Sequence, residues 1–67
     1  MEIILNNNKE IIAEENISVA DLIRIKNFTF KLLVTKVNGK LVKKDERDKV
    51  YIREGDDVAV LHLISGG

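Results

Sequence analysis

Apolar and polar residues alternate at the start of the chain, which predicts a strand with one apolar face. Met1, Ile3 and Leu5 lie on that face. Three asparagines and Lys9 follow, and they predict a turn because asparagine tolerates left-handed backbone and bonds to its own main chain. Residues 10–13 (Glu-Ile-Ile-Ala) return as a second strand, so an N-terminal hairpin is expected.

The next segment predicts a helix over residues 19–26. Ser18 and Asp21 have the spacing of a capping box, in which each side chain accepts a hydrogen bond from a backbone amide at the helix start. Asn27 is suited to end the helix in the left-handed conformation. Apolar residues spaced three and four apart place one stripe of the helix toward a core: Val19, Leu22 and Ile23.

The middle of the chain predicts a second hairpin. Residues 31–37 are rich in leucine and valine and are typical of a strand. Asn38 and Gly39 follow at once, and this dipeptide favours the type I′ turn that joins two hairpin strands. Residues 41–42 then form the short return strand.

A charged stretch and a turn lead to the last strand. Residues 43–49 (KKDERDK) mix both signs of charge and are interpreted as a solvated connection rather than a binding site. A short apolar segment at 50–52 and an acidic turn at 54–57 precede the final strand, 58–64. The expected fold class is therefore α+β, with one main helix on one face of a mixed sheet of four to five strands. We expect a single domain over residues 1–67, with a flexible tail at 65–67.

Composition excludes several kinds of chemistry. The 67 residues include no cysteine and one histidine, so a thiol nucleophile, a disulfide and a two-histidine zinc motif are excluded, and no metal site is expected. Eleven Lys and Arg balance eleven Asp and Glu, which argues against a nucleic-acid partner. The longest apolar run is far shorter than the ~20 residues of a membrane span, and no targeting segment is recognised. We therefore expect no membrane partner and a cytoplasmic location.

The last strand is apolar on both sides, although one helix covers only one face of a sheet. Val58 and Val60 have the parity of the core. The other side predicts a partner-binding face, because exposed apolar patches often mark such sites. Its expected members are Ala59, Leu61 and Leu63, with Leu32 or Val34 of the neighbouring strand as weaker members.

The chain ends in Ser65, Gly66 and Gly67. Two glycines without side chains allow such a tail to thread a narrow channel in another protein. The terminal carboxylate is ionised at neutral pH and is a poor electrophile. Its reaction requires activation, for example as an acyl-adenylate, which calls for ATP and a second protein.

The whole chain resembles the ThiS-type sulfur carriers, a β-grasp family with ubiquitin and the MoaD-type carriers as more distant relatives. The resemblance rests on the N-terminal hairpin MEIILNNNKEII, the helix start SVADLI, the hairpin VNGKLV and the final REGDDVAVLHLISGG. Relatives often carry an apolar or small residue before the two glycines, and Ser65 is a mild departure from this pattern.

The resemblance implies a sulfur carrier that is not itself an enzyme. An E1-like adenylyltransferase of the ThiF/MoeB type would bind the open sheet face and adenylate the Gly67 carboxylate, while Gly66 and Ser65 thread its active site. A persulfide donor would then convert the adenylate to a thiocarboxylate, which delivers sulfur to a thiazole synthase of the ThiG type. The carrier would supply no catalytic residue and bind no cofactor itself, and the activating enzyme would use the ATP.

Three alternatives remain open on the sequence. The first is a sulfur carrier for molybdopterin synthesis or tRNA thiolation, which uses the same chemistry. A ubiquitin-like modifier would instead be joined to lysines, and would be found as isopeptide-linked adducts. A non-covalent β-grasp interaction module would keep its function without Gly67.

Overall fold

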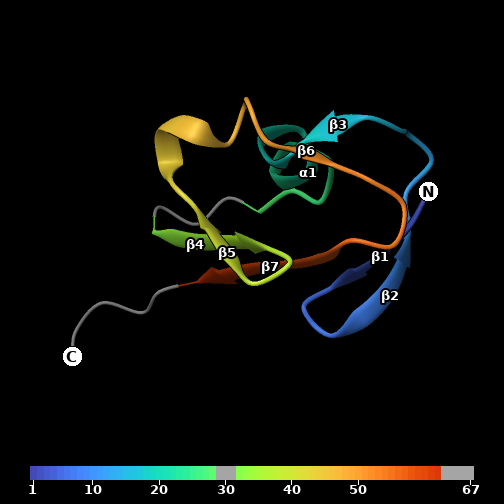
Figure 1. Cartoon of the computed structure of the whole chain (residues 1–67). Helices are drawn as coiled ribbons and strands as arrows, with labels where there is room; N and C mark the ends of the chain where they lie inside the picture. Colours follow the sequence, from blue (N-terminus) through green and yellow to red (C-terminus); the bar gives the residue numbers. More distant parts are fainter. Residues whose placement is uncertain (29–31, 63–67) are drawn as a thin grey trace.

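The main sheet has five strands in the order β2-β1-β7-β4-β5, and helix α1 (Val19–Ile25) packs on one of its faces (Figure 1). The structure is a computed structural model that describes residues 1–28 and 32–62. The strands of this sheet are β1 (Glu2–Leu5), β2 (Asn8–Ile11), β4 (Leu33–Val37), β5 (Lys40–Val42) and β7 (Asp57–His62). The expected α+β class is confirmed.

Strands from the two ends of the chain lie side by side at the centre of the sheet. β1 pairs with β7 in parallel, with Leu5 opposite Val58, whereas every other pairing in the sheet is antiparallel. A second sheet of two short strands, β3 (Ile17–Ser18) and β6 (Tyr51–Ile52), lies on the helix side. The apolar segment at 50–52 thus becomes β6, while β3 was not predicted.

The core lies between α1 and one face of the sheet. Ile3, Val19, Leu22, Ile52 and Val58 are fully buried at its centre. Leu5 and Val60 extend the same face, as the alternation along β1 and β7 predicts. The helix stripe is confirmed for its two buried residues, and Ile23 packs against the core while partly exposed.

Asparagine shapes the tight turns. Asn6 and Asn7 have positive φ, so β2 begins at Asn8 rather than at residue 10. Asn38 (φ 52°) and Gly39 (φ 82°) are both left-handed, as a type I′ turn requires. The predicted turn between β4 and β5 is confirmed.

Three predicted boundaries need adjustment. Helix α1 ends at Ile25, one residue early, and Asn27 has the expected left-handed conformation (φ 60°). Strand β4 begins at Leu33, so residue 32 lies outside the strand. Strand β7 runs from Asp57 to His62, and the predicted strand residues 63–64 lie outside the described residues, as does the tail at 65–67.

The charged stretch 43–49 is more structured than predicted. It contains a single 3₁₀ turn, η1 (Lys44–Glu46), and Arg47 is half-buried. The Arg47 carbonyl accepts a hydrogen bond from the Ala20 amide of α1 at 2.9 Å. The stretch therefore packs against the helix instead of being solvated throughout.

Helix α1 has seven residues. In the described part of the chain, no helix combines the length and the apolar content needed to cross a membrane.

Candidate functional site

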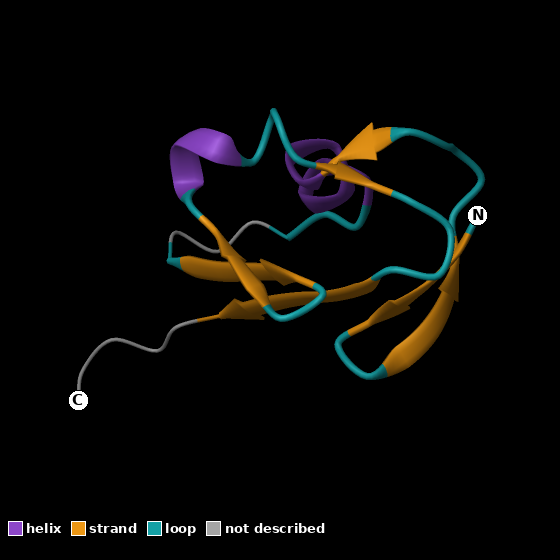
Figure 2. Ribbon diagram, viewed as in Figure 1, coloured by secondary structure: helices purple, strands orange, loops and turns teal. Residues whose placement is uncertain are grey.

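The face of the sheet opposite α1 carries the predicted partner-binding residues. In Figure 2, α1, β3, β6 and η1 lie on one side of the main sheet, and no described element crosses the other side. The register places Val34 opposite Leu61 and Lys36 opposite Ala59 on that side. Leu61 is 48% exposed, whereas its neighbour Val60 is buried. We call this surface the open face.

Three further apolar residues belong to the open face, and the sequence reasoning missed them. Ile4 follows buried Ile3 and therefore points to the opposite side. Ile11 and Leu41 precede buried residues and are 73% and 60% exposed. Alternation was the signal that could have found them, but it needed the knowledge of which neighbour faces the helix.

Strand β7 is held firmly up to the last residue that the structure describes. It pairs with β4 over five residues, from Val58 opposite Val37 to His62 opposite Leu33. On its other side, the Asn6 side-chain oxygen accepts a hydrogen bond from the Val60 amide at 2.8 Å. The last described residues of the chain therefore belong to a central, well-paired strand.

The predicted tail site follows β7 in the sequence. Leu63, which was predicted for the open face, lies outside the described residues, as do the tail residues Ser65, Gly66 and Gly67. Their predicted roles as partner contact, threading segment and activation site stay predictions.

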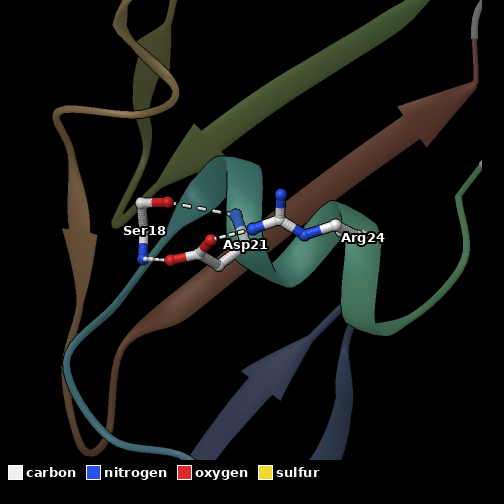
Figure 3. Close-up of polar contacts among 3 residues, drawn as sticks. All are labelled: Ser18, Asp21 and Arg24. Atoms are coloured by element: carbon white, nitrogen blue, oxygen red, sulfur yellow. Dashed lines mark hydrogen bonds and ion pairs between the residues drawn. The ribbon is translucent and has the colours of Figure 1, made fainter.

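The start of α1, the helix on the covered side of the sheet, is fixed by the predicted capping box (Figure 3). The Asp21 amide donates to the Ser18 hydroxyl at 3.0 Å, and the Ser18 amide donates to the Asp21 carboxylate at 3.1 Å. The Arg24 guanidinium also pairs with Asp21. The pKa of the Asp21 carboxyl lies below its usual value. The main cause is the hydrogen bond from the Ser18 amide, followed by the Ser18 hydroxyl and the Arg24 charge. This carboxylate therefore serves as a helix cap and stays ionised at neutral pH.

The acidic turn before β7 is structural. The Glu54 carboxylate accepts from the Glu2 amide at 3.0 Å, and the Asp56 carboxylate accepts from the Arg53 amide at 2.8 Å. Asn38 donates to Asp56 and accepts from the Asp57 amide, which links the two turns at this end of the sheet. Among residues 1–28 and 32–62, no three potential metal-binding side chains gather.

Two comparisons with known proteins agree with this arrangement. The model of the ThiS family matches residues 2–67. The structure is also similar to the crystal structure of the thiamine biosynthesis protein (ThiS) from Geobacter metallireducens, with a TM-score of 0.89 and 20% sequence identity over 100% of both chains. At that identity the structural similarity shows the β-grasp fold, and the match to the family model shows the relationship. The chain belongs to the ThiS family.

Proposed function

We propose that this protein is a sulfur carrier in thiamine biosynthesis and that Gly67 carries the sulfur. The observation that supports the proposal most is the extent of the family match, which reaches Gly67 and so includes the terminal pair of glycines. The similar structure from Geobacter metallireducens has the same fold over its whole length and is described as a thiamine biosynthesis protein.

The chemistry begins with activation of the carboxylate. A Gly67 oxygen attacks the α-phosphorus of ATP, so that an acyl-adenylate forms and pyrophosphate leaves. The terminal sulfur of a persulfide then attacks the acyl carbon and displaces AMP, giving an acyl disulfide. A thiol cleaves this disulfide, is itself oxidised to a mixed disulfide, and leaves the thiocarboxylate on Gly67.

The carrier is a substrate of these steps rather than their catalyst. Its sequence has no cysteine, so the persulfide and the reducing thiol belong to other proteins. An E1-like adenylyltransferase supplies the ATP site, and thiazole synthase receives the sulfur. The open face suits the docking of these partners because Leu61 and Leu41 offer exposed apolar surface there. We place these partners and the carrier in the cytoplasm.

The proposal is tested by mass spectrometry of the intact chain. The purified protein is incubated with the host's activating enzyme, ATP and a persulfide donor, and fragment ions locate any modification. We expect one terminal oxygen to be replaced by sulfur at Gly67. Localisation is essential, because oxidation of Met1 changes the mass by nearly the same amount.

A variant that lacks Gly67 is the matched control. It should fold with an unchanged melting temperature and should acquire no sulfur. An unmodified Gly67 in the wild type, with the activating enzyme active on ATP, contradicts the proposal. Lysine-linked adducts in its place would identify a protein modifier.

A further inference from the structure

Positive charge is concentrated in one continuous part of this neutral chain. Residues 24–44 contain seven Lys or Arg and no Asp or Glu, while the rest of the chain contains four Lys or Arg and all eleven acids. This segment includes the end of α1 and the β4–β5 hairpin. One edge of the sheet is therefore cationic although the net charge is zero.

The cations at the two ends of this segment differ in their partners. At the helix end, Arg24 pairs with Asp21, and Lys26 pairs with Glu10 at 3.1 Å. At the hairpin end, the exposed residues Lys43 and Lys44 make no ion pair with any other described residue. Their charges are available to an acidic group from outside the chain.

A hollow of about 220 Å³ lies beside these two lysines. Leu32 and Leu41, which are 50% and 60% exposed, give it an apolar wall, and Lys43, Lys44 and Arg47 give it a positive rim. None of the described residues that line it is acidic. The acids that follow in the sequence, Asp45 and Asp48, line a neighbouring hollow next to α1, which shares Lys44 and Arg47 with this one.

The hollow lies beside the last described residues of β7. Its wall includes Leu33 and Val34, which pair with His62 and Leu61 at the end of β7. Gly67 is five positions after His62, and five residues span at most about 18 Å. Any enzyme that acts on the Gly67 carboxylate must therefore come within about 18 Å of His62, at the end of β7 beside the hollow.

We propose that this hollow docks an acidic segment of the activating enzyme. The segment would place an apolar side chain between Leu32 and Leu41 and carboxylates beside Lys43 and Lys44. This inference rests on the proposed function and assigns the charge of the partner surface. Apolar walls next to unpaired cations fit such a protein segment better than they fit nucleic acid, which favours aromatic stacking surfaces.

Charged edge strands also protect a sheet from aggregation, and this second role must be separated from docking. Reversal of charge separates the two, because glutamates protect an edge as lysines do but repel an acidic partner. The test variant is therefore Lys43→Glu/Lys44→Glu. A matched control, Lys49→Glu/Arg53→Glu, makes the same change in net charge at exposed residues outside the cationic segment.

The measurement is the dissociation constant between the full-length chain and the activating enzyme at 50 and at 500 mM NaCl. At low salt we expect roughly a tenfold weaker complex for Lys43→Glu/Lys44→Glu and about a twofold change at most for the control. At high salt the difference should shrink, because exposed charges are screened. Melting temperatures of the three proteins show that each is folded.

Three results would overturn the inference. Equal affinity of wild type and Lys43→Glu/Lys44→Glu would contradict the docking of an acidic segment in this hollow. Conversion of Gly67 to the thiocarboxylate would still support the carrier function. An equal loss in the control would indicate a general effect of net charge. Tight binding of a single-stranded RNA oligonucleotide, lost only in Lys43→Glu/Lys44→Glu while enzyme affinity stays unchanged, would assign the hollow to nucleic acid.

Discussion

Asparagine occupies each left-handed position outside glycine in the part of the chain that the structure describes. These positions are Asn6, Asn7, Asn16, Asn27 and Asn38. A short polar side chain lowers the cost of positive φ by bonding locally, and two of these side chains also bind β7. The Asn6 oxygen accepts from Val60, and the Asn38 oxygen accepts from Asp57. Single residues thus shape the turns and hold the strand that carries the tail.

Asp21→Asn should make the start of α1 less stable in a pH-dependent way. The folded-state pKa of Asp21 lies below its unfolded value of 3.8, so the carboxylate adds stability above that value. This contribution is lost as the pH falls through the lower, folded-state pKa. We expect the wild type to exceed the variant in unfolding free energy at pH 7, and the difference to disappear in strong acid.

Urea unfolding at a series of pH values measures this difference. Asp48→Asn is the matched control, since the described residues show no hydrogen bond to that exposed carboxylate. A difference between wild type and Asp21→Asn that is independent of pH would contradict the assigned role of the charge.

Ser18→Ala should lower the free energy of unfolding by about 1 kcal/mol at neutral pH, because the hydroxyl that caps the helix is then lost.

At the scale of elements, consecutive residues of β7 contribute to two different surfaces, the core and the open face. Val58 and Val60 complete the core under α1, while Ala59 and Leu61 lie on the open face. The division follows from the alternation of a strand, so a shift in register by one residue would exchange the two surfaces. Pairing on both sides, with β1 and β4, prevents that shift.

Val60→Ala and Leu61→Ala should therefore have opposite effects on stability and binding. Val60 is 4% exposed, and its truncation leaves a cavity that we expect to cost about 2 kcal/mol. Leu61→Ala should cost less than about 0.5 kcal/mol and should weaken binding of the activating enzyme instead. Urea denaturation and a binding titration on both variants check this. A large stability loss for Leu61→Ala would place that side chain in the core.

At the scale of the whole molecule, one arginine ties three parts of the fold together. The Arg47 carbonyl accepts from Ala20 of α1, its Nε donates to the Thr35 hydroxyl at 3.2 Å, and its Nη2 donates to the Leu33 carbonyl at 2.7 Å. Thr35 is fully buried on β4 and donates in turn to the Val42 carbonyl at 2.8 Å. The helix, the charged stretch and the β4–β5 hairpin are thereby joined.

Arg47→Lys should lower the stability of the whole domain by about 2 kcal/mol. A lysine cannot reproduce two hydrogen bonds from one planar group, and hydrogen bonds to charged groups contribute about 1.5–3 kcal/mol. Thermal unfolding measures the change, with Arg53→Lys, at an exposed position, as the control. An equal melting temperature for wild type and Arg47→Lys would show that the contacts of Arg47 contribute nothing to stability.

Signals within a few residues of one another predicted the local structure correctly. The capping box at Ser18 and Asp21 and the Asn38-Gly39 turn depend on hydrogen bonds and backbone angles inside a single turn. The parity of β7 was also readable, because neighbouring side chains on a strand point to opposite sides. The predicted tail at 65–67 lies outside the described residues and stays a prediction.

Other features were decided only by the tertiary structure, because they join residues that are far apart in the sequence. The sequence by itself determined the helix, the hairpins and the apolar character of β7. Tertiary contacts placed β7 between β1 and β4, paired β3 with β6 and brought the Arg47 side chain to Leu33 and Thr35 of β4. They also left Ile4 and Ile11 on the open face. A local pattern shows that two sides differ, but the side that meets water depends on where the helix packs.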